Sequence, residues 1–294
     1  MTTTASKGLS PAQVETYGAK GYVAVENVIT DVELAEIDAV VEELVEASRT
    51  VTSENDVYIM EEGHSPDTPK LARIQSPSKQ HAVFERLSRH PLILDCVESL
   101  IGPDIRFQGE KLNLKTAEFG RAVEWHQDFA FYPHTNDSML AVGVALDDCT
   151  LDNGCLLIVP GSHAVPILDH HQDDHFIGAI LPSRGEIDLG KAEPVEVKAG
   201  GISIHHVRAL HGSEPNRSAK PRRLLLLQYA AVDAMPLGGV SDYDEFNALI
   251  VRGEPTYDFR MGDMMIRVPH GGRSTGGAIF GIQETSEEKL LAGQ

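Results

Sequence analysis

Residues 123–133 read VEWHQDFAFYP and place a histidine and an aspartate two positions apart, at His126 and Asp128. In a β-strand, side chains two positions apart point to the same face, so this imidazole and this carboxylate lie side by side. Such a pair suits either a solvated polar face or a bound metal ion. A third metal ligand elsewhere in the chain would distinguish the two interpretations.

A candidate third ligand lies in the segment ISIHHVRALHGSEPNRSAKPRRLLLLQY, which spans residues 202–229. His211 ends a strand-like stretch, and a turn and a new strand beginning at Arg222 follow it. This layout brings a distant histidine back beside the first pair. His205 and His206 are rivals, but the arginine that follows His206 at the same spacing lies in a turn-like stretch and faces solvent. We therefore expect His211 to be the third ligand.

Two imidazoles and one carboxylate form a facial triad, which leaves three positions open on an octahedral metal and is typical of non-haem Fe(II) oxygenases. The lack of thiolate ligands disfavours a structural zinc site. If 2-oxoglutarate fills two open positions, its distal carboxylate needs a cation, and arginine binds a carboxylate bidentately. Arg222 or Arg223 is expected to supply this cation, and only one of them faces inward because side chains alternate along a strand.

The composition restricts the possible partners. The chain has 294 residues and a net charge of −19, which argues against nucleic acid and against an anionic membrane surface. No apolar run approaches the roughly 18 residues of a membrane span, and no secretory signal or peroxisomal address is visible. The three cysteines, Cys96, Cys149 and Cys155, lack CxxC spacing and indicate free thiols in a reducing compartment. We expect a cytoplasmic protein that acts on a small molecule.

The first part of the chain, residues 10–103, reads as helical. Apolar residues recur at helical spacing after the expected N-cap residues Ser10 and Thr30, and again in HPLILDCVESLIG at 90–102. Residues 50–80 are polar, carry several prolines and are expected to form an irregular loop. This region is expected to pack on the core that follows it.

From residue 104 the apolar period changes to two, and strand-like segments separated by Gly, Asn, Asp and Pro continue to residue 231. Helices followed by a run of strands predict an α+β, mainly β protein, with a sandwich or barrel formed by residues 104–231. Residues 164–192 are expected to form a lid, and residues 232–294 a C-terminal extension or second lid.

Four segments resemble the phytanoyl-CoA dioxygenase (PhyH) family of Fe(II)/2-oxoglutarate oxygenases: WHQD at 125–128, NGCLLIVPGSH at 153–163, HGSEPNRSAKPRR at 211–223, and GYVAVENVITDVELAEIDAVVEEL at 21–44. The resemblance runs from about residue 10 to residue 231. It implies a double-stranded β-helix, or jelly-roll (cupin-like), core with flanking helices, and a single oxygenase domain over residues 1–294.

The resemblance also implies roles for individual residues. His126, Asp128 and His211 would bind iron, and Arg222 would hold 2-oxoglutarate. Three further side chains are candidate contacts of this cosubstrate: Ser213, Gln127 and Asn113. The implied reaction consumes O2 and 2-oxoglutarate, releases succinate and CO2, and hydroxylates a small molecule. The missing peroxisomal address and the unmatched region after residue 231 argue against an acyl-CoA substrate.

Two other classes of function stay open at this point. One is a jelly-roll protein that binds a metal in a binding or sensor role, and the other is a hydrolase or isomerase that uses another divalent metal. Neither needs a buried carboxylate clamp, so the position of Arg222 distinguishes them from an oxygenase.

Other motifs have simpler interpretations. His171 and His175 in DHHQDDH have the spacing of a zinc-protease pair, but Gln172 replaces the catalytic glutamate, so a solvated charged loop is expected. Trp125 is expected in the core or in a pocket wall. Four arginines of the C-terminal region form either surface ion pairs or, for one of them, a contact to an anionic substrate: Arg252, Arg260, Arg267 and Arg273.

Overall fold

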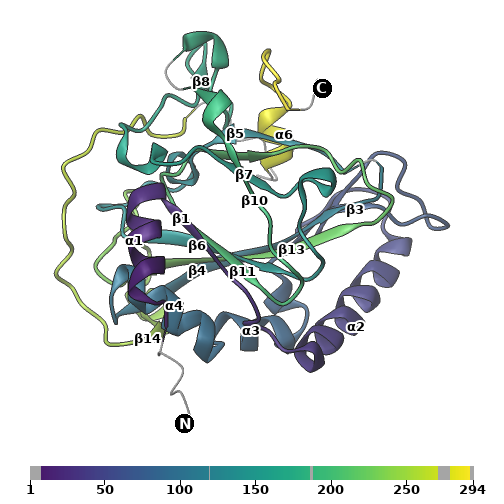
Figure 1. Ribbon diagram of the computed structural model, residues 1–294, viewed down its shortest axis with the longest axis horizontal. Coiled ribbons are helices and arrows are strands. Elements are labelled where there is room, and N and C mark those ends of the chain that lie inside the picture. Colours follow the sequence, from purple (N-terminus) through teal and green to yellow (C-terminus); the bar gives the residue numbers. More distant parts are fainter. Residues whose placement is uncertain (1–7, 119, 186–187, 271–278, 292–294) are drawn as a thin grey trace.

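Two antiparallel sheets face each other, and helices cover the outer face of the larger one (Figure 1). The computed structural model describes residues 8–118, 120–185, 188–270 and 279–291. The helices are α1 (Pro11–Lys20), α2 (Asp31–Ala47), α3 (Ala82–Ser88), α4 (Pro91–Ile101), α5 (Tyr243–Ala248) and α6 (Ile279–Gln283). Among the described residues, no helix combines the length and the apolar character that a bilayer crossing requires.

Local sequence signals set the first two long helices. Ser10 caps α1 in a capping box with Gln13, and the helix ends at Gly21, whose φ of 81° is left-handed. Thr30 caps α2 in the same way with Glu33. These predicted helix starts are confirmed. They could be read from the sequence because the side chains that bond to the free backbone N–H groups lie within four residues of each helix start.

The larger sheet has the strand order β1-β11-β6-β13-β4-β3-β2, with β14 paired to the far end of β4. Its strands are β1 (Tyr22–Val25), β11 (Ile202–His206), β6 (Met139–Ala145), β13 (Arg222–Ala231), β4 (Ile105–Lys115), β3 (Leu71–Gln75), β2 (Tyr58–Met60) and β14 (Ile250–Arg252). The smaller sheet has the order β10-β7-β12-β5, from Glu193–Val195, Leu156–Ile158, His211–Ser213 and Val123–His126. A hairpin of β8 (His171–Gln172) and β9 (His175–Phe176) stands apart.

The four consecutive leucines of β13 show why this strand lacks alternation. Leu225 and Leu227 pack with helix residues in the main apolar core, while Leu224 and Leu226 face the smaller sheet and the pocket between the sheets. Both faces of β13 are therefore covered, and a strand covered on both faces reads as a continuous apolar run. The arrangement is a jelly-roll core with flanking helices, as predicted.

One expectation about the fold is wrong. Residues 50–80 are not only a loop, because they contain β2 and β3, which extend the larger sheet beyond β4. With β1, this means that the sheet takes strands from before residue 104. The pattern was hidden because β2 and β3 are short, and because Arg73 interrupts the apolar residues of β3. Their pairing depends on a ladder with β4, which lies far along the chain.

Candidate metal centre

The three predicted ligands come together between the two sheets. Strand β5 ends at His126, Gln127 stays extended, and a 3-10 turn begins at Asp128, so the alternation of a strand continues far enough to align the two side chains. His211 begins β12 and lies opposite His126 in the ladder of the smaller sheet. The ligand atoms of His126, Asp128 and His211 lie within 4.8 Å of one another, and all three residues are buried.

Backbone carbonyls orient both histidines. Nδ1 of His126 lies 2.7 Å from the Glu124 carbonyl, and Nδ1 of His211 lies 2.9 Å from the Ala209 carbonyl. A nitrogen that donates to a carbonyl carries the ring proton, which leaves Nε2 of each ring with the lone pair that binds a metal. Burial lowers the pKa of His126 to about 4 and lowers the pKa of His211 well below its ordinary value. Both rings are therefore neutral at pH 7 and ready to coordinate.

Asp128 stays ionised despite its burial. Burial by itself raises the pKa of a carboxyl group, but contacts with His205, Lys111 and the two histidine ligands outweigh it and hold the pKa of Asp128 well below its ordinary value. An anionic carboxylate between two neutral imidazoles is the donor set expected for a ferrous ion.

His205 is buried beside the three predicted ligands. From the sequence, it was an alternative to His211 as the third ligand. Its Nε2 lies 3.4 Å from Oδ2 of Asp128, and its ring centroid lies 4.5 Å from that of His211. Neither ring nitrogen has a hydrogen-bond partner among the described residues. His206 points the other way, where its Nδ1 accepts a hydrogen bond from the Arg208 N–H. The alternation of β11 thus places His205 inside and removes His206 from the site.

Arg222, not Arg223, faces the pocket. Its Nη2 donates to the Gly154 carbonyl at 2.8 Å, and its Nε and Nη1 have no partner among the described residues although both are buried. Arg223 lies on the opposite face of β13 and forms ion pairs with Asp147 at 2.7 Å and Asp38 at 3.1 Å. Buried N–H groups without acceptors are rare, so the free guanidinium edge fits a carboxylate ligand.

Lys115 is a pocket residue that sequence reasoning missed. It lies opposite Arg222 in the β4–β13 ladder, and its Nζ donates to the carbonyls of Ser213 and Glu214. Burial, followed by the nearby charge of Arg222, lowers its pKa well below the ordinary value for lysine. Ser213 and Asn113, both predicted contacts of the cosubstrate, line the same pocket.

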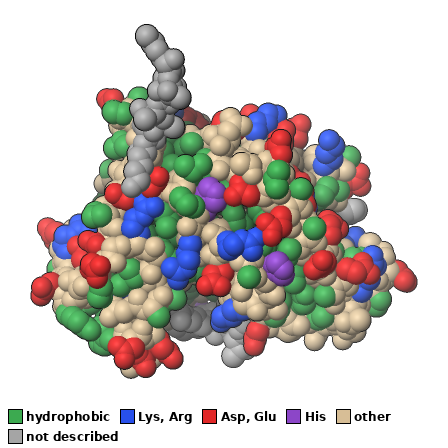
Figure 2. Space-filling view, turned by 90° about the horizontal axis from the view of Figure 1, so that it is seen from below, with side chains coloured by type: hydrophobic (Ala, Val, Ile, Leu, Met, Phe, Trp, Pro, Cys, Tyr) green, Lys and Arg blue, Asp and Glu red, His purple; other side chains and the backbone are tan. Residues whose placement is uncertain are grey.

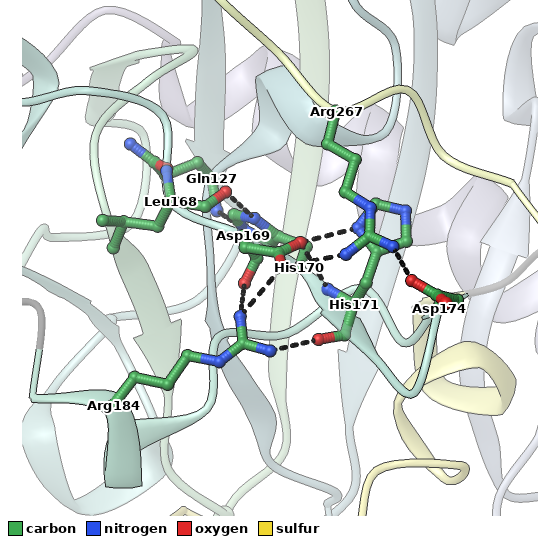
Figure 3. Close-up of polar contacts among 8 residues, drawn as sticks. All are labelled: Gln127, Leu168, Asp169, His170, His171, Asp174, Arg184 and Arg267. Atoms are coloured by element: carbon green, nitrogen blue, oxygen red, sulfur yellow. Dashed lines mark hydrogen bonds and ion pairs between the residues drawn. The ribbon is translucent and has the colours of Figure 1, made fainter.

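The structure does not bring Gln127 into the pocket. Its Oε1 accepts from the Leu168 N–H at 2.8 Å, and its Nε2 donates to the Arg208 carbonyl at 2.7 Å. Its backbone N–H donates to Nε2 of His170 at 2.9 Å (Figure 3). Gln127 lies on an extended backbone between His126 and Asp128, which point into the pocket, so its side chain points away from the pocket. Instead, these hydrogen bonds connect the segment after residue 164 to the end of β5, the strand that carries His126.

The DHHQDDH segment is not simply a solvated loop, so this expectation is corrected. His170 and His171 are buried, whereas Asp173, Asp174 and His175 are exposed. Figure 3 shows Arg184 and Arg267 converging on Asp169, and Arg267 also pairs with Asp174. The Phe176 ring packs against His171, which is buried, whereas His175 of the same hairpin is exposed. No metal-binding group forms from these residues within the described part of the chain.

Three of the four C-terminal arginines form ion pairs at the surface. Arg252 pairs with Asp95, Arg260 with Asp233, and Arg267 with Asp169 and Asp174, whereas Arg273 lies outside the described residues. The described arginines of this group therefore do not reach the pocket. Trp125 packs in an apolar cluster with Leu157 and Leu210, as predicted.

The pocket is cationic, although the protein is acidic. Its basic lining residues are Arg73, Lys111, Lys115, Arg121 and Arg222, and its carboxylates are Glu61 and Asp128. The face seen in Figure 2 is different, because acidic side chains are spread among basic and apolar ones there. The pocket thus concentrates positive charge in a chain whose net charge is −19.

The pocket combines a buried His-x-Asp pair, a distant histidine and an arginine whose buried Nε and Nη1 have no partner among the described residues. On a jelly-roll core, these features define the class of Fe(II)/2-oxoglutarate oxygenases. The model of the family "Phytanoyl-CoA dioxygenase (PhyH)" matches residues 17–224, and the chain belongs to this family.

Known relatives agree with this assignment. The Stutzerimonas stutzeri protein named "Probable alpha-ketoglutarate-dependent hypophosphite dioxygenase" is 35% identical over 281 residues, which cover 94% of this chain and 98% of that protein. The ectoine dioxygenase of Bordetella bronchiseptica is 26% identical, and 76% of each chain is covered. The solved structure of the epimerase SnoN with Fe3+, alpha ketoglutarate and nogalamycin RO has a TM-score of 0.61 at 26% identity, with 86% and 95% of the two chains covered. The chain is an iron- and 2-oxoglutarate-dependent dioxygenase.

Proposed function

We propose that His126, Asp128 and His211 bind one ferrous ion, and that Arg222 anchors the distal carboxylate of 2-oxoglutarate. The observation that carries this proposal is the free, buried edge of Arg222 in the same pocket as the triad. A protein that used its metal only for sensing, or for hydrolysis or isomerisation, would have no need of a buried carboxylate clamp. Both alternatives are therefore less well supported than an oxygenase.

Neighbouring side chains complete the cosubstrate site that we propose. Lys115 adds a nitrogen donor beside Arg222, and the Ser213 hydroxyl and the Asn113 amide supply polar groups in the same pocket. Leu224 and Leu226 form an apolar wall that excludes water. In a dry pocket each charge-assisted hydrogen bond is stronger than in water, so the cosubstrate is held in one orientation.

The ferrous ion and 2-oxoglutarate, when bound, supply the activation of O2. One oxygen atom enters succinate, the carboxylate next to the keto group leaves as CO2, and the other oxygen atom enters an X–H bond of the substrate. The residues of this chain contribute orientation: the Glu124 and Ala209 carbonyls fix the two imidazoles, and Asp128 stays anionic.

We also propose a cytoplasmic location, which the three free, buried cysteines support.

We further propose that the substrate is a small phosphorus oxyanion. The named activity of the Stutzerimonas stutzeri relative, which is similar along almost the whole chain, supports this choice, and so does the cationic pocket. With hypophosphite, one P–H bond would become P–OH, so that hypophosphite, O2 and 2-oxoglutarate give phosphite, succinate and CO2. Loss of a proton from the new P–OH group balances the charge.

The test has two stages. Anaerobic addition of 2-oxoglutarate to the Fe(II)-loaded protein should produce a weak visible charge-transfer band, because the keto acid chelates the metal. Succinate release is then measured in air with hypophosphite, phosphite, short alkylphosphonates, carboxylates and acyl thioesters. A missing band with correctly folded protein rejects the proposed cosubstrate site. Succinate release that responds only to acyl thioesters rejects the small oxyanion.

A further inference from the structure

Two cations of the pocket, Lys111 and Arg73, have no carboxylate within ion-pair distance among the described residues. Nε of Arg73 donates to Oδ1 of Asn113 at 2.8 Å, but its two Nη groups make no hydrogen bond in the described part of the chain, and neither does Nζ of Lys111. Phe280 of α6 packs against the Arg73 guanidinium, with its ring centroid 5.0 Å from Cζ. Burial lowers the pKa of Lys111 to about 8 and that of Arg73 to about 10, so both are mainly charged at pH 7.

These two cations are separate from the Arg222 end of the pocket. Lys111 and Lys115 share one face of β4, but four residues of strand put their Cα atoms roughly 13 Å apart. Arg222 lies opposite Lys115 in the ladder, whereas Arg73 lies opposite Asn113 from the other side of β4. A single carboxylate cannot occupy both places. The pocket therefore offers two cationic subsites on one strand face.

The second subsite lies on the side of the metal ligands. In the register of the larger sheet, His205 lies in one row with Ala141, Gln228 and Gly109, and Gly109 is two residues from Lys111 but six from Lys115. His205 in turn lies 3.4 Å from Asp128. An anion held by Lys111 and Arg73 would thus lie beside the metal centre, where the substrate bond must be placed for reaction.

The charges of the proposed complex leave this subsite uncompensated. The ferrous ion and Asp128 together carry one positive charge, and dianionic 2-oxoglutarate offsets that charge and the charge of Arg222. Arg121 is already paired with Glu61 at 2.8 Å. Burial and the nearby charge of Arg222 favour the uncharged form of Lys115, so the charges of Lys111 and Arg73 remain. Unpaired charges away from water are unfavourable, so a further anion is needed when the pocket closes.

We propose that Lys111 and Arg73 bind an oxyanion group of the substrate and place it beside the metal. This inference rests on the proposed function and adds to it the residues that select the substrate by charge. The chemistry recognised is a compact oxyanion, and phosphinate, phosphonate and carboxylate groups all satisfy it. Lys111 is a substrate-binding residue, distinct from the Arg222 clamp of the cosubstrate.

The experiment measures binding of small anions to the anaerobic Fe(II)–2-oxoglutarate complex by calorimetry. The probes are hypophosphite, phosphite, methylphosphonate and acetate, with acetamide as a neutral analogue of acetate. Lys111→Met keeps the length of the side chain but removes its charge, and Lys111→Arg retains the charge. Lys79→Met, at an exposed position, is the matched control for loss of one lysine.

We expect Lys111→Met to weaken binding of the preferred anion by at least about tenfold, since a charge-assisted hydrogen bond contributes on the order of 1.5–3 kcal/mol. Lys111→Arg should restore most of this affinity, and Lys79→Met should resemble the unmodified protein. The 2-oxoglutarate concentration that gives half of the charge-transfer band should stay within about twofold in all variants. The set of anions that bind then shows whether the substrate carries a phosphorus oxyanion or a carboxylate.

Three results would overturn the inference. The first is equal anion affinity in Lys111→Met and the unmodified protein. The second is weakened 2-oxoglutarate binding in Lys111→Met, which would assign Lys111 to the cosubstrate. The third is acetamide binding as tightly as acetate. A charge-transfer band that forms normally in each of these cases leaves the proposed function intact, whereas absence of the band in the unmodified protein rejects that function itself.

Discussion

The arginines around the β8–β9 hairpin and the cations of the pocket have opposite environments. Arg184 and Arg267 lie near the surface, and both reach Asp169 at 3.1 Å, as Figure 3 shows. Arg222 is buried and Lys111 is half-buried in the pocket, and neither forms an ion pair within the described residues. Paired surface charges hold one segment against another and need nothing more. Unpaired buried charges are unfavourable in the free protein, so their presence indicates a ligand.

The largest effect expected is that of a lost metal ligand. His211→Ala should abolish turnover and weaken Fe(II) binding by more than about a hundredfold, beyond what loss of an outer contact causes. Anaerobic titration with Fe(II) measures the affinity, and thermal unfolding checks the fold. His206→Ala is the matched control because its ring points away from the triad. If His206→Ala loses iron and His211→Ala keeps it, the assignment of the third ligand is wrong.

The next effect is on the cosubstrate. Arg222→Met removes the buried charge while keeping similar volume, and it should raise the 2-oxoglutarate requirement by roughly a hundredfold with little change in Fe(II) affinity. The ligand-free protein should be at least as stable as before, because an unpaired buried charge has been removed. Arg223→Met, which breaks the surface pairs with Asp147 and Asp38, should instead lower stability and leave the requirement unchanged. The reverse pattern would move the clamp to Arg223.

A smaller effect is expected from pH, through His170, a buried histidine directly before the β8–β9 hairpin. Burial lowers the pKa of His170 to about 4, whereas a histidine in the unfolded chain titrates near 6.5. Between these values the unfolded chain binds a proton that the folded chain does not. The free energy of unfolding should therefore fall as pH drops from about 6.5 toward 4, by about 1.4 kcal/mol per pH unit for this group, and stay level above pH 7.

Denaturant unfolding of the metal-free protein at pH 7, 6 and 5 measures this dependence. His170→Gln retains an acceptor for the Gln127 N–H but cannot be protonated, so it should reduce the slope by about one proton. Identical slopes in the two proteins would show that His170 is not a source of the acid sensitivity.

The smallest effect is expected at the surface around the β8–β9 hairpin. Arg267→Ala removes the contacts with Asp169 and Asp174, but exposed ion pairs contribute little and are screened by salt. The unfolding midpoint should fall by less than about 2 °C, and the 2-oxoglutarate requirement should not change. A change in that requirement comparable to the effect of Arg222→Met would remove the distinction between the charges around the hairpin and those of the pocket.

Short-range signals let the sequence determine much of this protein. The capping boxes at Ser10 and Thr30 lie within a few residues, and so does the alternation that puts His126 and Asp128 on one side. His211 could be chosen because it precedes a strand that opens with arginine. The jelly-roll class followed from the change of period at residue 104 and from the resemblance to a known family. Iron and 2-oxoglutarate chemistry followed from the donor set.

Only the tertiary structure decided which neighbouring side chains share the pocket. The leucines that follow lack alternation, so the residues alone left Arg222 and Arg223 open, and only the resemblance favoured Arg222; the register of β13 against β4 turns Arg222 toward the pocket. The same register brings Lys115 to Arg222, and the pairing of β3 with β4 brings Arg73 to Asn113. His205 lies beside Asp128 because two sheets face each other. These contacts join residues that lie far apart along the chain. Burial between the two sheets, which no local pattern encodes, leaves cationic groups of the pocket without ion-pair partners and available to ligands.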